Sequence, residues 1–174
     1  MDDRSKRPAW LKEALLPREV ISSERAASKE LAEAIAFFEQ QPLLNTFLSA
    51  VPNIVLVLNE TRQIVYANDR LLKALGCENR DVCGLRPGEL FGCIHAFEQP
   101  GGCGNAEFCR TCGAVKAILG SLWGHEMVEE CRILKSNNEA LEFRVWTMPF
   151  TWESRHYTIF SLSRCDPRKA TCSA

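Results

Sequence analysis

The chain has 174 residues, a length that suits one domain with extensions. Apolar residues make up 46% of it and charged residues 25%, which excludes a wholly disordered or fibrous protein. The formal net charge of -1 provides no overall basic field for nucleic acid or an anionic membrane. We therefore expect a local site to carry the function.

The pattern of apolar residues predicts neither a membrane span nor a leader. The longest apolar stretches, such as Ile54 to Leu58, are far too short to cross about 30 Å of hydrocarbon. The first seven residues, MDDRSKR, are not followed by the apolar core of a secretory leader. We expect a cytoplasmic protein.

Cysteine content is the most unusual feature of the composition. Nine cysteines are many for a protein kept in a reducing compartment, where a disulfide framework is not the default. The odd number also makes complete pairing within one chain impossible. Metal or redox chemistry is therefore the leading interpretation.

Residues 1–44 are predicted to form an arm and an amphipathic helix ahead of the main domain. We expect residues 1–21 to pack loosely. A helix is predicted over residues 23–40, with Ser22 or Ser23 as its N-cap. Its apolar stripe would cover an open sheet face or pair with a second copy, and we expect a homodimer with this helix at or beside the interface. The stripe comprises Ala27, Leu31, Ala34, Ile35 and Phe38.

The next elements are predicted to be two strands and a short helix. A second helix through residues 43–48 ends before Pro52, and the run 54–58 then favours a strand. Residues 64–66 pair with it as a hairpin. Asn68 is expected to cap the helix that follows, and Gly76 to end it in a left-handed conformation.

Residues 77–112 are predicted to be mostly irregular because they are rich in glycine. Helical spacing then indicates a helix from Cys112 or Gly113 to about Gly124. Three strands follow, over residues 127–134, 141–150 and 156–162. Short turns between them imply an antiparallel meander.

This order of elements, with the sequences LSAVPNIVLVL (48–58) and IVYANDRLLKALG (64–76), resembles the PAS sensory domain, of the cysteine-rich kind found in bacterial signal-transduction proteins. The resemblance implies an α+β fold, a five-stranded antiparallel sheet with short helices on one face and an N-terminal helical extension. It covers residues 45–163, with a cysteine-rich insertion at 77–113 and a polar tail at 164–174. It also implies that Asn68 could line a ligand cavity, although its capping role explains it fully.

The most specific motif is a group of four cysteines within residues 93–112, spaced C-x9-C-x5-C-x2-C: Cys93, Cys103, Cys109 and Cys112. Cysteines two residues apart converge on one metal without strain, and the interleaved glycines let the backbone approach an inorganic centre. At a helix start, the Cys112 thiolate would be stabilised by unpaired N–H groups. The alternatives are a reversible disulfide and free thiols.

His95 lies two residues after Cys93 and is a further candidate metal ligand. All-thiolate coordination serves both Zn²⁺ and a [4Fe–4S] cluster, and spacing separates the two poorly. A sensory fold with surplus cysteines favours a cluster, whereas the nearby histidine favours zinc. The sequence leaves the choice open.

The other five cysteines lie outside this group. Cys77 and Cys131 are interpreted as small buried apolar residues. Cys83 is a less favoured replacement ligand. Cys165 and Cys172 are expected to be exposed thiols of the tail.

No catalytic constellation is found. Glu129 stands where the segment beginning at His125 would need its second histidine for a zincin site, and His156 is interpreted as a surface or core residue. Phosphate loops, dinucleotide fingerprints and nucleophile elbows are absent from the sequence. We therefore do not expect an enzyme.

The sequence thus predicts a PAS-type sensor of redox state or metal. Cys93, Cys103, Cys109 and Cys112, with His95 as a further ligand, would hold a [4Fe–4S] cluster or Zn²⁺ and signal through a partner protein such as a kinase or regulator. No nucleic acid or membrane partner is expected. Two alternatives stay open: a thiol–disulfide oxidoreductase using Cys109 and Cys112, and an interaction module whose zinc braces a long loop.

Overall fold

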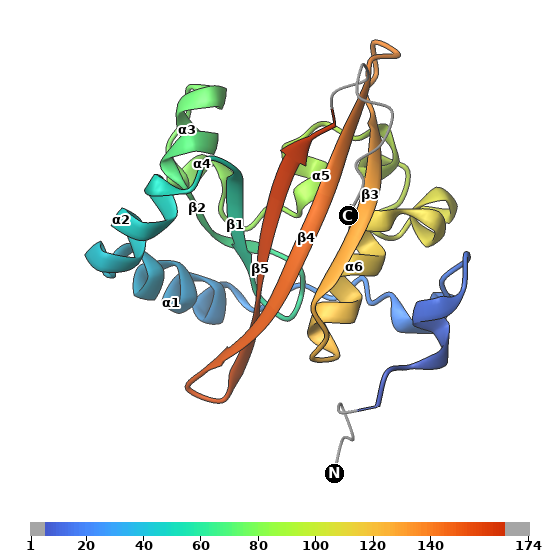
Figure 1. Ribbon diagram of the computed structural model, residues 1–174, viewed down its shortest axis with the longest axis horizontal. Coiled ribbons are helices and arrows are strands. Elements are labelled where there is room, and N and C mark those ends of the chain that lie inside the picture. The colour runs from blue at the N-terminus through green and yellow to red at the C-terminus, as the bar shows by residue number, and fades with distance from the viewer. Residues whose placement is uncertain (1–5, 166–174) are drawn as a thin grey trace.

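The computed structural model describes residues 6–165 (Figure 1). Among these residues, no helix is long and apolar enough to cross a membrane. The elements in chain order are η1 (Ala9–Lys12), η2 (Arg18–Val20), α1 (Ser28–Glu39), α2 (Pro42–Ala50), β1 (Ile54–Leu58), β2 (Ile64–Ala67), α3 (Asp69–Leu75), α4 (Asn79–Val82), α5 (Pro87–Leu90), η3 (Ile94–Phe97), η4 (Glu107–Thr111), α6 (Gly113–Leu122), β3 (Met127–Leu134), β4 (Ala140–Trp152) and β5 (Arg155–Arg164).

The five strands form one antiparallel sheet in the order β2-β1-β5-β4-β3. This confirms the predicted α+β fold with a five-stranded antiparallel sheet. Strands β4 and β5 are longer than the sequence indicates, because their pairing continues to Trp152 and Arg155 at the turn. Glu153 and Ser154 make that turn with positive φ angles of 46° and 63°.

Asn68 and Gly76, which flank the helix after the first hairpin, act as predicted. Asn68 caps α3: its side-chain oxygen accepts hydrogen bonds from the backbone N–H groups of Leu71 and Val55. Gly76 ends the helix in the left-handed region with a φ of 65°. Because the Asn68 amide also donates to the carbonyls of Leu48 and Asn53, this side chain joins α2 to the sheet. The capping interpretation is therefore confirmed.

The main core lies between the sheet and α6, which runs behind the sheet in Figure 1. Strand β1 points Leu56 and Leu58 into this core, and β5 points Phe160 and Leu162 into it. On α6, the buried Ile118 packs against them. Alternate strand positions thus define an inner face, and this face forms one wall of the site described below.

The predicted helix start at Ser22 or Ser23 is wrong, because α1 begins at Ser28 with no side-chain cap. The carbonyl oxygens of Ser22 and Ser23 instead accept hydrogen bonds from the guanidinium groups of Arg62 and Arg86. These long-range contacts hold the segment ahead of α1 outside the helix.

The apolar stripe of α1 packs within the chain, on the opposite face of the sheet. Ala34 and Phe38 are buried against Val57, Val65 and Tyr157. Packing inside one chain, the alternative we considered for this helix, thus accounts for the stripe from Leu31 to Phe38, whereas Ala27 lies before the helix and is exposed. The homodimer stays a prediction.

The arm ahead of α1 is not loosely packed, contrary to our expectation. Leu11 and Leu16 are buried, with exposed fractions of 5% and 1%. The Leu16 N–H donates to the carbonyl of Arg110, and the Arg110 Nε donates back to the carbonyl of Leu16. This reciprocal pair ties the arm to η4, which carries Cys109.

The packing of α1 predicts that alanine substitutions of two phenylalanines lower the free energy of unfolding by different amounts. Phe38→Ala should lower the free energy of unfolding by about 3–5 kcal/mol, because Phe38 is 2% exposed and contacts Phe150 and Tyr157 edge-on. Phe47→Ala on α2 is the matched control: Phe47 is 64% exposed, and the change should stay within about 0.5 kcal/mol. Urea unfolding measures both. Equal losses would contradict the packing of α1 on the sheet.

Candidate functional site

Short helical turns fill the segment that we expected to be irregular. α4, α5, η3 and η4 follow one another between α3 and α6. Several of these turns end near a glycine with positive φ, including Gly84 at 86° and Gly92 at 68°. Because each turn is short, the chain folds back repeatedly and returns its cysteines to one place.

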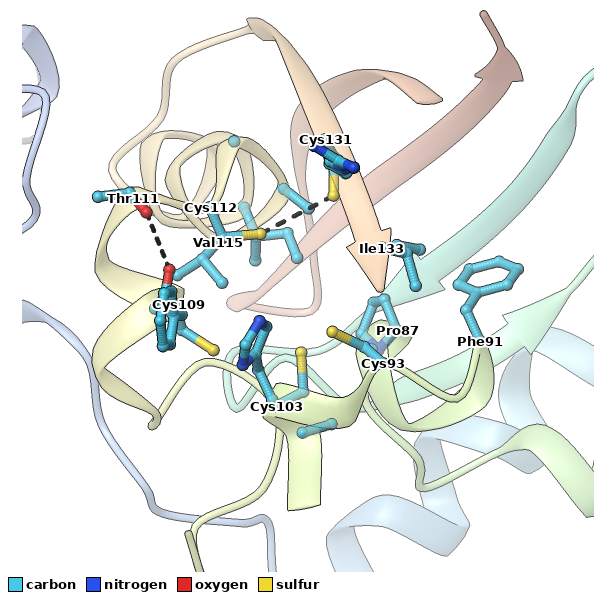
Figure 2. A pocket seen from close by; sticks show the side chains of 18 of the residues that line it. Pro87, Phe91, Cys93, Cys103, Cys109, Thr111, Cys112, Val115, Cys131 and Ile133 are labelled. Atoms are coloured by element: carbon cyan, nitrogen blue, oxygen red, sulfur yellow. Dashed lines mark hydrogen bonds between the residues drawn. The ribbon is translucent and has the colours of Figure 1, made fainter. Parts of the chain in front are cut away.

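A pocket of about 370 Å³ lies between these turns and the inner face of β3 (Figure 2). Figure 2 shows the cysteine sulfur atoms pointing into this space from different elements. Besides these thiols and His95, the lining is mostly apolar, and its other polar residues are Thr111, Glu130 and Arg132. The cysteines that line it are Cys93, Cys103, Cys109, Cys112 and Cys131.

All five residues predicted from the sequence as ligands line this pocket: Cys93, His95, Cys103, Cys109 and Cys112. Their role as ligands stays a prediction. As the side chains stand, no three His, Cys, Asp or Glu residues within 6–165 could hold one metal ion together. The thiols therefore surround a space and do not meet at a point.

Cys131 is the pocket residue that sequence reasoning missed. It was interpreted as a buried apolar residue, and it is indeed buried, but its sulfur lies 3.8 Å from that of Cys112. The signal was its position in the strand. Cys131 lies an even number of residues from Met127 and from Ile133, so all three side chains point to the inward face of β3. Because α6 packs on that face, Cys112, the residue immediately before α6, lies opposite Cys131.

The other cysteines within residues 6–165 do not line the pocket. Cys77 and Cys83 are half-buried at the margin of the main core. Burial, with a smaller contribution from Glu39, raises the pKa of Cys83 to about 12. Cys165 is half-buried, so the expectation of an exposed thiol is wrong for this residue, and Cys172 lies outside the described residues.

His95 is held from two sides. Its Nδ1 lies 2.6 Å from a carboxylate oxygen of Glu98, and its ring stacks on Phe108 with centroids 4.6 Å apart. A neutral imidazole that donates from Nδ1 leaves Nε2 as an acceptor. This is the arrangement by which proteins orient a metal-binding histidine.

The pKa values of the pocket thiols are shifted in different directions. Burial raises the pKa of Cys103 to about 12, with further contributions from Cys112 and Cys109, and burial also raises the pKa of Cys109. A hydrogen bond from the Cys131 thiol lowers the pKa of Cys112 to about 6, against the effect of burial. The same bond raises the pKa of Cys131. The hydrogen bond from Cys131 thus favours the thiolate form of Cys112, whereas burial disfavours the thiolate forms of Cys103 and Cys109.

Two buried arginines lie beside the pocket. Arg86 is 1% exposed and donates to backbone carbonyls of Thr61, Gly101, Cys103, Ser23 and Glu24. Arg62 packs against Gly104 so closely that a Cβ there would lie 1.8 Å from a guanidinium nitrogen. The cysteine segment is thus fixed to the hairpin and to the chain ahead of α1.

Comparison with protein families gives one match, to the PAS domain, over residues 43–111. The match includes Cys93, Cys103 and Cys109 but not Cys112. The comparison with curated proteins finds no match.

Solved structures with a similar fold are PAS domains of low identity. That of nitrogen regulation protein NR(II) from Vibrio parahaemolyticus is 14% identical, with a TM-score of 0.49, and 71% of this chain and 98% of that chain are covered. The PAS domain of BvgS from Bordetella pertussis is 15% identical, with a TM-score of 0.47 and coverage of 74% and 87%. That of an HTR-like protein from Haloarcula marismortui is 14% identical, with a TM-score of 0.46 and coverage of 74% and 99%.

The Cys112–Cys131 hydrogen bond predicts a specific pH titration. In chelator-treated protein, ultraviolet thiolate absorbance should show one group half-ionised near pH 6 and protonated below it. Cys131→Ala removes the donor, so the midpoint should rise toward the ordinary value of about 8.5. Cys83→Ala, outside the pocket, should leave the titration unchanged. A midpoint near 6 in Cys131→Ala would contradict this origin of the shift.

Proposed function

We propose that this chain, which contains a PAS domain, is a signal-sensing module that reports redox state or metal through its cysteine pocket. The observation that carries the proposal is the convergence of five thiols and one oriented imidazole on a single cavity. A cavity needed only for stability would be filled by apolar side chains.

The proposed centre is held by Cys93, Cys103, Cys109 and Cys112. Thiolates are the ligands of iron–sulfur clusters and of structural zinc, and both displace the thiol proton. The raised pKa values of Cys103 and Cys109 mean that these two groups give up protons when they ligate. Binding should therefore weaken as the pH falls.

The spacing of the sulfur atoms favours a cluster over a single ion. Four thiolates around one zinc, with bonds of about 2.3 Å, lie about 4 Å from one another. The Cys112 and Cys131 sulfur atoms lie 3.8 Å apart, but within residues 6–165 no group of three His, Cys, Asp or Glu side chains is placed to hold one ion. In a cluster, several iron and sulfide atoms occupy the space between the cysteines, which suits a cavity of about 370 Å³.

Zinc is the second candidate, and His95 is the observation that favours it. Its Nδ1 contact with Glu98 orients the ring as second-shell partners orient zinc-bound histidines. In that form the metal would brace the turns from α5 to η4, and the domain would serve as an interaction module.

The thiol–disulfide oxidoreductase alternative receives less support. In such enzymes, a cysteine with a lowered pKa attacks the substrate. Burial raises the pKa of Cys109, the first cysteine of the Cys109–Cys112 motif, and the sulfur closest to Cys112 belongs to Cys131. We therefore propose a non-enzymatic sensor that acts through a partner protein, such as a kinase or regulator.

The buried arginine provides a route from the pocket to α1. The Arg86 guanidinium donates hydrogen bonds to the carbonyls of Gly101 and Cys103 beside the pocket. It also donates to the carbonyls of Ser23 and Glu24 ahead of α1. A change in the backbone around Cys103 must alter these bonds. The segment ahead of α1 would then respond to the state of the centre.

Metal analysis tests the proposed centre. Protein purified without oxygen should be coloured and contain iron and sulfide. Replacing Cys93, Cys103, Cys109 or Cys112 with Ser should lower bound metal by about tenfold or more. Cys77→Ser and Cys83→Ser are matched controls outside the pocket and should keep it. Colourless protein with stoichiometric zinc would favour the bracing role, and unchanged metal content in all four variants would overturn both forms.

Hydrogen exchange tests the route to α1. Removing the centre should increase exchange in residues 85–113 and in residues 22–26 of the unmodified chain. In Arg86→Lys, the ammonium cannot reproduce the planar fork of the guanidinium, so residues 22–26 should no longer respond. Arg80→Lys, at an exposed position on α4, is the control and should respond like the unmodified chain. Unresponsive residues 22–26 in the unmodified chain would contradict this route.

A further inference from the structure

Cys112 and Cys131 form a thiol pair of their own within the pocket. Their sulfur atoms lie 3.8 Å apart, and the dashed line in Figure 2 joins them. Cys112 stands immediately before α6, and Cys131 faces it from the middle of β3. Because they come from different elements, their closeness is a product of the fold.

The backbone beside both cysteines is held tightly. A Cβ on Gly113 would lie 1.9 Å from the carbonyl oxygen of Glu130, so only glycine permits this approach of α6 to β3. One turn further along α6, the Lys116 ammonium lies 3.5 Å from a carboxylate oxygen of Glu129. The two sulfur atoms therefore need only a side-chain movement to reach bonding distance.

We infer that Cys112 and Cys131 are a modification site that a hydroperoxide oxidises to a reversible disulfide. This goes beyond the proposed sensor, because it requires no metal centre. A disulfide at this site also withdraws Cys112 from ligation, since the thiolate is the ligating form. Oxidation of the pair and occupation of the pocket through Cys112 thus exclude each other.

The roles of the two cysteines follow from their surroundings. Cys112 is half-buried, and the backbone N–H groups of Ala114 and Val115 at the start of α6 face its sulfur. Such groups stabilise negative charge on the attacking sulfur. Cys131 is 7% exposed, less accessible than Cys112, so it acts as the resolving thiol.

The oxidation proceeds in two balanced steps. The sulfur of Cys112 attacks the terminal oxygen of the hydroperoxide: an S–O bond forms, the O–O bond breaks, and an alcohol leaves with the thiol proton. The sulfur of Cys131 then attacks that of Cys112, the S–S bond forms, and the hydroxyl group leaves as water with the Cys131 proton. A dithiol returns two electrons and two protons and restores both thiols.

The tryptic peptides of the chain make this bond directly visible. Trypsin cleaves after Arg110, Lys116 and Arg132, so Cys112 and Cys131 lie alone in residues 111–116 and 117–132. The full chain, both as purified and after chelator treatment, is exposed to hydrogen peroxide, alkylated and digested. After chelator treatment, mass spectrometry should show these two peptides joined and lighter by two hydrogen atoms than their sum, and dithiothreitol should separate them. A centre held through Cys112 should lower the yield of the joined peptides in the chain as purified.

Two serine variants distinguish the Cys112–Cys131 disulfide from disulfides between Cys112 and other cysteines. In Cys131→Ser the joined peptides should be lost, and dimedone should label Cys112 as the unresolved sulfenic acid. Cys83→Ser, outside the pocket, is the control and should give the same yield as the unmodified chain. Joining of residues 111–116 to the peptide that contains Cys109, or a Cys112 that remains alkylated throughout, would overturn the inference. Iron, sulfide and zinc contents are measured on the same samples, so failure of the proposed sensor is scored separately.

Discussion

The guanidinium of Arg86 is the group on which the arrangement of the site depends. It is almost wholly inaccessible, and its bonds reach backbone carbonyls in three segments: residues 23–24, Thr61 and residues 101–103. Burial lowers the pKa of Arg86 only to about 10, so it stays charged at neutral pH. A buried charge that loses its partners costs several kcal/mol, and separating any of these segments therefore carries a large penalty. The nearby carboxylate of Glu89 accepts from Arg25 and from the backbone of Arg86 and Cys103, which closes the network.

The cysteine segment needs this support because it has little regular structure of its own. Its helical turns are short, and four of its cysteines, Cys93, Cys103, Cys109 and Cys112, line the pocket. Three external groups compensate: Arg86 at Cys103, Arg62 at Gly104, and the reciprocal bonds between Leu16 and Arg110 beside Cys109. The pocket is thus assembled by contacts distant in sequence, and each of its walls is tied to a different part of the chain.

This division explains what the sequence could and could not predict. Strand β1, the Asn68 cap and the Gly76 stop follow from local chemistry, and the structure confirms them. The start of α1 could not be predicted, because two distant arginines occupy carbonyls that a helix starting there would use. The role of Cys131 was missed for a related reason: its neighbours in sequence describe a strand, whereas its partner, Cys112, comes from the facing helix. Spacing therefore identified the four clustered cysteines, and only packing added the fifth.

The fifth cysteine changes the chemistry of the other four. Without Cys131, Cys112 would lose the hydrogen bond that lowers its pKa, and burial would act on it as it does on Cys103 and Cys109. With Cys131 in place, this hydrogen bond favours the thiolate form of Cys112. A thiolate is both the better metal ligand and the better nucleophile. The same contact that prepares the pocket for a soft metal thus prepares it for oxidation, so ligation and disulfide formation compete for the one sulfur atom of Cys112.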